Sequence, residues 1–144
     1  MAQISVNQIA KELNKRERKA RSAAMEKWKK LAKPLIKKEI NTRIDKGVSP
    51  VQAQPNYKKY SPKYKLGRKR PVNLKDTGKM RKTLTVRSVT GGISVFFTSA
   101  IHKYHNGEGR VRRATLPIDS KGETFKNGIK KNLRNLFIKV FKIK

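Results

Sequence analysis

From about Ser5 to about Lys46 the apolar residues recur mostly three or four positions apart, the spacing of one face of an α-helix. Ser5, followed three residues later by Gln8, has the pattern of a capping box at a helix start. The stripe consists of Val6, Ile9, Leu13, Ala24, Trp28, Leu31, Leu35, Ile40 and Ile44. We therefore expect residues 1–46 to be helical, with Lys, Arg and Glu around one apolar stripe.

Two features modify this helix. The stretch from Asn14 to Arg21 has almost no apolar residue, so we expect it to face solvent or a partner. Pro34 lacks a backbone N–H and clashes with the preceding turn, so it is expected to kink or split the helix. We predict two helical pieces rather than one rod.

The chain changes character from Gly47 to Asn73, where four prolines interrupt a Lys-rich and Tyr-rich stretch without periodicity. Long segments of this kind are uncommon inside compact domains and tend to be functional or disordered. We expect residues 47–75 to form an extended basic arm or loop that serves as the main contact segment.

Two runs with strand periodicity follow a short helical turn predicted at residues 79–82. Apolar and polar residues alternate on either side of Gly91-Gly92, a good signal for a β-hairpin. The alternating apolar positions are Leu84, Val86, Ile93, Val95 and Phe97. A further strand is predicted from Arg113 to Ile118.

The last segment places its apolar residues at helical spacing among lysines and arginines, which predicts an amphipathic C-terminal helix. The apolar positions are Phe125, Ile129, Leu133, Leu136, Phe137, Val140 and Phe141. The expected fold is α+β in a single domain, residues 1–144, with residues 76–144 forming a small antiparallel sheet and this helix.

The 144 residues include 38 Lys plus Arg against 9 Asp plus Glu, a net charge of +29. Charge of this size repels itself, so an anionic partner is implied. Lysine outnumbers arginine, which favours attraction to phosphate or carboxylate over base-specific readout. The chain contains no cysteine, hence no disulfide or thiolate metal site, and it has no signal-peptide pattern and no apolar run long enough for a bilayer. A cytoplasm-like environment without membrane contact is therefore expected.

Basic runs with nearby tyrosines suit a phosphate backbone and stacked bases, although a solvated loop is the alternative for any single run. The candidate contacts are Tyr57, Lys58, Lys59, Tyr60, Lys63, Lys65, Arg68, Lys69, Arg70, Arg110, Arg112 and Arg113.

Two short motifs suggest chemistry. Asp76-Thr77-Gly78 spells an aspartic-protease signature, but Lys75 and Lys79 flank it where an apolar strand belongs, so a turn and helix cap is the preferred interpretation. His102, His105 and Glu108 could bind a metal, but a fourth ligand is lacking, so we interpret His105 and Asn106 as turn or interface residues. No catalytic residue, metal or cofactor is predicted, and the chain is not expected to be an enzyme.

Several motifs also occur in a suggestive order: Pro62 and Tyr64 in a basic loop, residues 72–84 around Asp76-Thr77-Gly78, the hairpin, His105 to Gly109, then Arg113 to Pro117 and a closing helix. This order resembles the phage virion morphogenesis family, the tail-completion or neck proteins of Mu-like and related tailed phages. The chain departs from the family where Ala114 follows Arg113, a position at which the family usually has an aromatic residue.

The resemblance implies a structural virion subunit at the head–tail junction, assembled in the host cytoplasm into a ring, expected to be hexameric, around the DNA channel. Its partners would be further copies of itself, neighbouring connector and tail proteins, and DNA bound without sequence preference. The alternative is a basic nucleic-acid-binding protein of ribosomal or chromatin type, favoured by the charge and the interleaved tyrosines.

Overall fold

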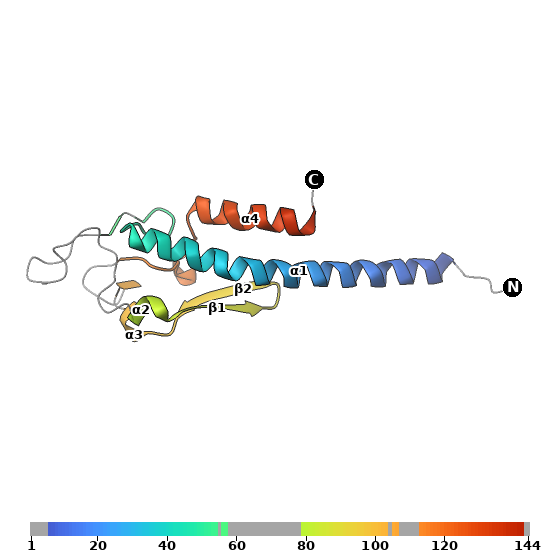
Figure 1. The fold of residues 1–144 in the computed structure, drawn as a ribbon, viewed down its shortest axis with the longest axis horizontal. Helices are drawn as coiled ribbons and strands as arrows, with labels where there is room; N and C mark the ends of the chain where they lie inside the picture. The colour runs from blue at the N-terminus through green and yellow to red at the C-terminus, as the bar shows by residue number, and fades with distance from the viewer. Residues whose placement is uncertain (1–5, 55, 58–78, 104, 107–112, 143–144) are drawn as a thin grey trace, which may run out of the picture.

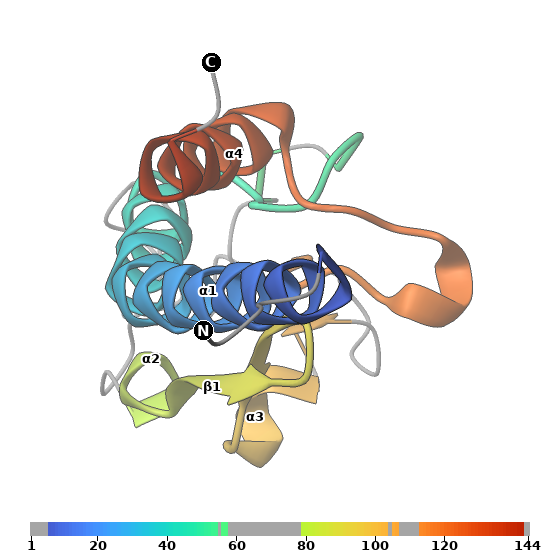
Figure 2. The same ribbon diagram turned by 90° about the vertical axis from the view of Figure 1, so that its right-hand side faces the viewer.

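One long helix, α1 (Val6–Asp45), lies between a shorter helix and a β-hairpin (Figures 1 and 2). The computed structural model describes residues 6–54, 56–57, 79–103, 105–106 and 113–142. Helix α4 (Asn127–Phe141) packs against α1 on one side, and the hairpin packs on another. The remaining elements are α2 (Lys79–Lys82), β1 (Leu84–Val89), β2 (Gly92–Phe97), α3 (Ala100–Lys103) and a 3-10 turn (Asp119–Lys121). The predicted α+β fold is confirmed.

Helix α1 runs without interruption through Pro34, so the predicted division into two pieces is wrong. Pro34 has no backbone N–H to donate to the Lys30 carbonyl. Because Pro34 is exposed, that carbonyl lies on the solvent side of the helix, where water can donate a hydrogen bond to it. The helix is held on both sides of this position, since Trp28 contacts α4 and Ile36 belongs to the core cluster with the hairpin. Tertiary packing outweighs the local cost of the proline.

The hairpin forms as its alternation predicts. Leu84 pairs with Phe97 and Val86 with Val95 in an antiparallel register, so the apolar side chains share one face of the sheet. Val89 pairs with Gly92, and the two-residue turn between them uses Gly91 at a positive φ of 75°.

The core lies where the hairpin, α2, α4 and the C-terminal half of α1 meet. Ile36, Ile40 and Ile44 line one side of α1, because they are spaced four residues apart. The other buried members of this cluster are Tyr57, Met80, Leu84, Phe97, Leu116 and Ile129. The core therefore involves only the second half of the long helix.

Helix α4 is held along a different side of α1 by aromatic and polar contacts. The Trp28 indole N–H donates to the Leu133 carbonyl at 3.4 Å, and the Trp28 ring meets Phe137 edge-on with centroids 5.9 Å apart. The side-chain amide of Asn132 donates to Glu39 at 2.9 Å. These contacts fix the position of the amphipathic C-terminal helix.

Residues 47–54, the first part of the predicted arm or loop, form a partly buried loop and not an extended arm. Ser49, Pro50 and Val51 are fully buried, and Val51 forms an isolated antiparallel bridge with Phe125. The Gln52 side chain then accepts a hydrogen bond at 3.1 Å from the first backbone N–H of α4. Residues 47–54 thus form part of the domain and help to start α4, while the later part of the arm, residues 58–75, lies outside the described residues.

The strand predicted at residues 113–118 is also wrong. Its central residues are buried, as their apolar pattern indicated, but they belong to no ladder in the described part of the chain. Side chains take the role of a neighbouring strand: the Ser49 hydroxyl donates to the Ala114 carbonyl at 2.6 Å, and Asn106 accepts from the next two backbone N–H groups. Alternation alone did not reveal these side-chain partners.

Candidate functional site

Tyr57 is not a stacking surface for nucleic acid, contrary to the sequence-based expectation. Its side chain is 8% exposed and belongs to the core. Its hydroxyl donates to the Ala114 carbonyl at 3.3 Å, and its backbone N–H donates to Gly47 at 2.8 Å. Tyr57 thus holds the segment that follows Ser49 against the domain, and its aromatic ring packs in the core.

Most of the other predicted contact and turn residues lie outside the described residues, and their roles stay predictions. These are Lys58, Lys59, Tyr60, Lys63, Lys65, Arg68, Lys69, Arg70, Arg110, Arg112, Asp76, Thr77 and Gly78. Of the predicted set, the structure describes Arg113, His105 and Asn106 in addition to Tyr57.

Asn106 organises the backbone around residue 115. Its side-chain oxygen accepts hydrogen bonds from the backbone N–H groups of Thr115 at 3.0 Å and Leu116 at 3.2 Å. Thr115 is fully buried and Leu116 nearly so. One amide side chain therefore satisfies two N–H groups that would otherwise be costly to bury.

His105 directly precedes Asn106, and its backbone carbonyl accepts a hydrogen bond from the Arg113 backbone N–H at 2.7 Å. Burial and the positive charge of Arg113 together lower the pKa of the His105 imidazole below its usual value. His102, the other histidine, stacks on Phe97 with ring centroids 4.6 Å apart. Within the described ranges no three His, Asp or Glu side chains gather where a metal ion could be held.

The lowered pKa of His105 predicts a stability that depends on pH. The unfolded chain binds a proton near pH 6.5, whereas the folded chain binds it only at lower pH. The free energy of unfolding should therefore fall as the pH is lowered from about 7, and level off below the folded-state pKa. Urea unfolding at a series of pH values measures this. The His105→Gln variant should lose that part of the dependence, and parallel curves for variant and wild type would contradict the assignment.

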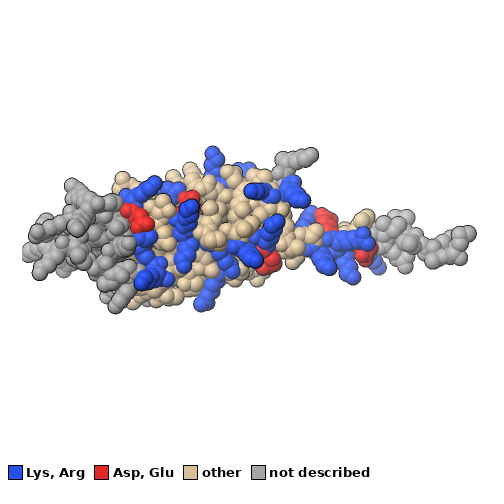
Figure 3. Space-filling model, viewed as in Figure 1, with Lys and Arg blue, Asp and Glu red and all other residues tan. Residues whose placement is uncertain are grey.

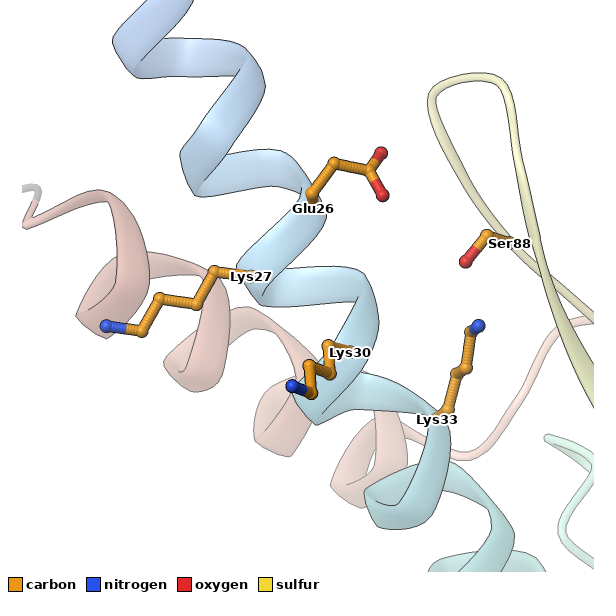
Figure 4. Close-up of a pocket in the computed structure, with 5 residues that line it drawn as sticks. All are labelled: Glu26, Lys27, Lys30, Lys33 and Ser88. Atoms are coloured by element: carbon orange, nitrogen blue, oxygen red, sulfur yellow. The ribbon is translucent and has the colours of Figure 1, made fainter.

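A cationic groove of about 420 Å³ lies between α1 and the tip of the hairpin, lined by Lys27, Lys30, Lys33, Glu26 and Ser88 (Figure 4). In Figure 4 the Lys33 ammonium and the Ser88 hydroxyl point toward each other across the space between helix and hairpin. The one carboxylate in the lining, on Glu26, is 2.9 Å from the ammonium of Lys29. Its charge is thus already matched, and of the three lysines in the lining Figure 4 shows Lys33 reaching toward the hairpin, while the ammonium groups of Lys27 and Lys30 point away from it.

A second hollow, of about 520 Å³, lies between β2 and the residues around 116 and 124. Ile93, Val95 and Phe125 form its apolar part. Glu123, the one acidic residue among its described lining residues, accepts the Ile118 backbone N–H at 3.0 Å and stabilises the turn before α4. Asn106, also in this lining, accepts the Thr115 and Leu116 backbone N–H groups, so both side chains stabilise the local backbone.

The first half of α1 projects beyond the rest of the domain (Figure 1). Residues 10–23 are all exposed, which confirms the expectation for the stretch from Asn14 to Arg21. Leu13, the large apolar residue of this stretch, is 60% exposed. Figure 3 shows Lys and Arg spread over this face of both the body and the projecting part, with few Asp or Glu.

Comparison of the chain with protein-family models, with curated proteins and with solved structures gave no match. The resemblance in motif order therefore stays a prediction. No helix among the described residues is long and apolar enough to cross a membrane.

The groove lysines were not among the sequence-based candidates, because the helical pattern placed them on the solvated side of an amphipathic helix. The available signal was their spacing: Lys27, Lys30 and Lys33 follow one another at intervals of three residues, so successive members are neighbours on the surface of α1. Their proximity to Ser88 depends on how the hairpin docks on the helix, and the spacing of the lysines does not predict that arrangement.

Proposed function

We propose that the protein is a structural virion subunit at the head–tail junction of a tailed phage, which assembles into a ring around the DNA channel and has no catalytic role. The order of the sequence motifs supports this proposal. So does the form of the protomer, whose long cationic helix extends beyond its own core.

The observation that carries the proposal is the exposure of residues 10–23. A charged helix of this length that packs against nothing is marginal in water, since most helical stability in proteins comes from tertiary packing. Two ion pairs along it, Glu12 with Arg16 and Glu17 with Arg21, add only a few tenths of a kcal/mol each. Contact with a neighbouring subunit would provide the missing packing surface, and a ring offers that contact to every copy.

The net charge of +29 sets a condition on assembly. Copies of such a chain repel one another at low ionic strength, and the repulsion weakens once salt or a polyanion screens the charge. DNA in the channel of a ring would provide that screening permanently. The charge therefore suits a subunit that assembles around DNA.

Light scattering of the purified chain tests the proposal. We expect a monomer at low salt and a single larger species of fixed mass at high salt or with duplex DNA. Leu13→Glu should shift that species toward monomer, because it puts a charge on an exposed apolar position of the projecting helix. Ile101→Glu is the matched control, since Ile101 is also exposed, at 46%, but lies on α3.

A chain that remains monomeric in high salt and with DNA, yet binds RNA or DNA with a steep salt dependence, would favour the basic nucleic-acid-binding alternative. Equal loss of the larger species in both glutamate variants would count against a role of the projecting helix.

A further inference from the structure

We propose that one side of α1, together with the groove beside the hairpin, binds the phosphodiester backbone of duplex DNA. The binding residues are Lys15, Lys19, Lys30, Lys33 and Lys37, which we call the lysine row. This inference rests on the proposed function only in choosing DNA as the polyanion. It places the contact on a part of the chain that the sequence-based candidates did not include.

The lysine row has two groups, Lys15 with Lys19 and Lys30 with Lys33 and Lys37, which helical geometry aligns. At 3.6 residues per turn its members project from the same side of α1. Trp28 and Glu39, which contact α4, lie on the other side of the helix. At about 1.5 Å per residue, Lys15 and Lys37 are about 33 Å apart along the axis. One turn of duplex DNA is about 34 Å long, so the row spans about one turn and can meet the phosphates at the places where the winding backbone faces it.

The charges of the row are available. Each glutamate described on α1 pairs with a cation outside the row: Glu12 with Arg16, Glu17 with Arg21, Glu26 with Lys29, and Glu39 with Arg43. Within the described part of the chain, no carboxylate lies within 4.0 Å of the ammonium of Lys30 or Lys33. Glu26 lies on the same side of α1 as the row, between Lys19 and Lys30, but its carboxylate is paired with Lys29.

The chemistry favours a duplex backbone over other polyanions. The row and the described residues of the groove lining include no aromatic side chain, and stacking on aromatics is how single strands are usually held. All five members are lysines, which contact phosphate as point charges and read base edges poorly. The Ser88 hydroxyl opposite Lys33 adds a donor of the kind that often contacts phosphate oxygens. Binding without sequence preference follows.

Fluorescence anisotropy with a labelled duplex, measured over a range of salt concentrations, tests the row. The triple variant Lys19→Gln, Lys30→Gln, Lys33→Gln should bind more weakly, and the slope of log K against log salt should become shallower by about 2 to 3 units, at about 0.9 per lost phosphate contact. The matched control is Lys131→Gln, Lys139→Gln, Lys142→Gln, which removes the same charge from exposed positions of α4 and just beyond it. We expect its slope to remain close to that of the wild type.

Equal changes of the salt slope in the two triple variants would contradict the lysine row as the binding site, since they would mean that net charge alone governs binding. Tighter binding of single-stranded DNA or of polyglutamate than of the duplex would overturn the choice of ligand.

The Ser88→Glu variant tests the site if circular dichroism shows that the triple variant does not fold. Ser88 is an exposed hairpin position, and the substitution puts a carboxylate at the groove, so it should weaken duplex binding severalfold. Unchanged affinity would contradict the site. Loss of the ring with row-dependent binding intact would contradict only the proposed function.

Discussion

Replacing Ile40 by alanine is expected to lower the free energy of unfolding by about 2–5 kcal/mol. Ile40 is fully buried at the centre of the cluster that α1 forms with the hairpin and α4. Truncation removes three carbon atoms from a packed site, and its neighbours Ile36 and Ile44 are held on the same rigid helix, so the cavity can close only partly. Urea unfolding at one fixed protein concentration measures the loss.

Ile101→Ala is the control, because it makes the same chemical change at a position that is 46% exposed. It should cost less than about 1 kcal/mol, since a surface truncation leaves no cavity. Similar losses in both variants would mean that Ile40 does not lie at the centre of the core.

Replacing Asn106 by alanine is expected to cost about 1–3 kcal/mol, because it leaves the backbone N–H groups of Thr115 and Leu116 without their acceptor. Burial of Thr115 and Leu116 limits the access of water to replace that acceptor. The segment from Arg113 to Ile118 has no strand partner among the described residues, so its position depends on this side chain more than a ladder strand would. Urea unfolding at one protein concentration measures the cost.

Asn106→Asp is the matched control, since a carboxylate keeps an oxygen acceptor at the same place. It should lose markedly less stability than the alanine variant. If both variants lose the same amount, the effect comes from the rest of the Asn106 side chain, and the acceptor role is wrong.

Elements whose stability depends on their own periodicity could be predicted from the sequence. The alternation of Leu84 and Val86 with polar residues, and of Ile93, Val95 and Phe97 after the glycines, specified both the strands and the face they bury. The helical spacing near the C-terminus likewise predicted α4, which begins two residues after Phe125 and ends at Phe141. In each case a one-residue shift would expose the apolar side, so the pattern leaves little choice.

The sequence-based predictions were wrong where contacts distant in sequence override local signals. Pro34 stays within a helix because tertiary packing supports both of its flanks. The prolines after Gly47 suggested an arm, yet Pro50 is fully buried and its carbonyl accepts the Lys126 N–H at 2.8 Å. Nothing near Pro50 in the sequence indicates a partner more than seventy residues away.

The candidate surface was predictable in its charge and not in its location. Tyrosines near lysines suggested stacking, but Tyr57 packs into the core, whereas the exposed cations of α1 follow the pattern of ordinary solvated residues. What distinguishes Lys33 from other surface lysines is the hairpin docked beside it, with Ser88 across the groove. That relation arises from the fold.

Electron microscopy of the purified full chain, in high salt or with duplex DNA, tests most directly whether the protein closes into a ring. We predict closed particles of one size with a central opening, in which the projecting half of α1 contacts the neighbouring subunit. A field of single protomers under conditions where DNA is bound would contradict the proposed function.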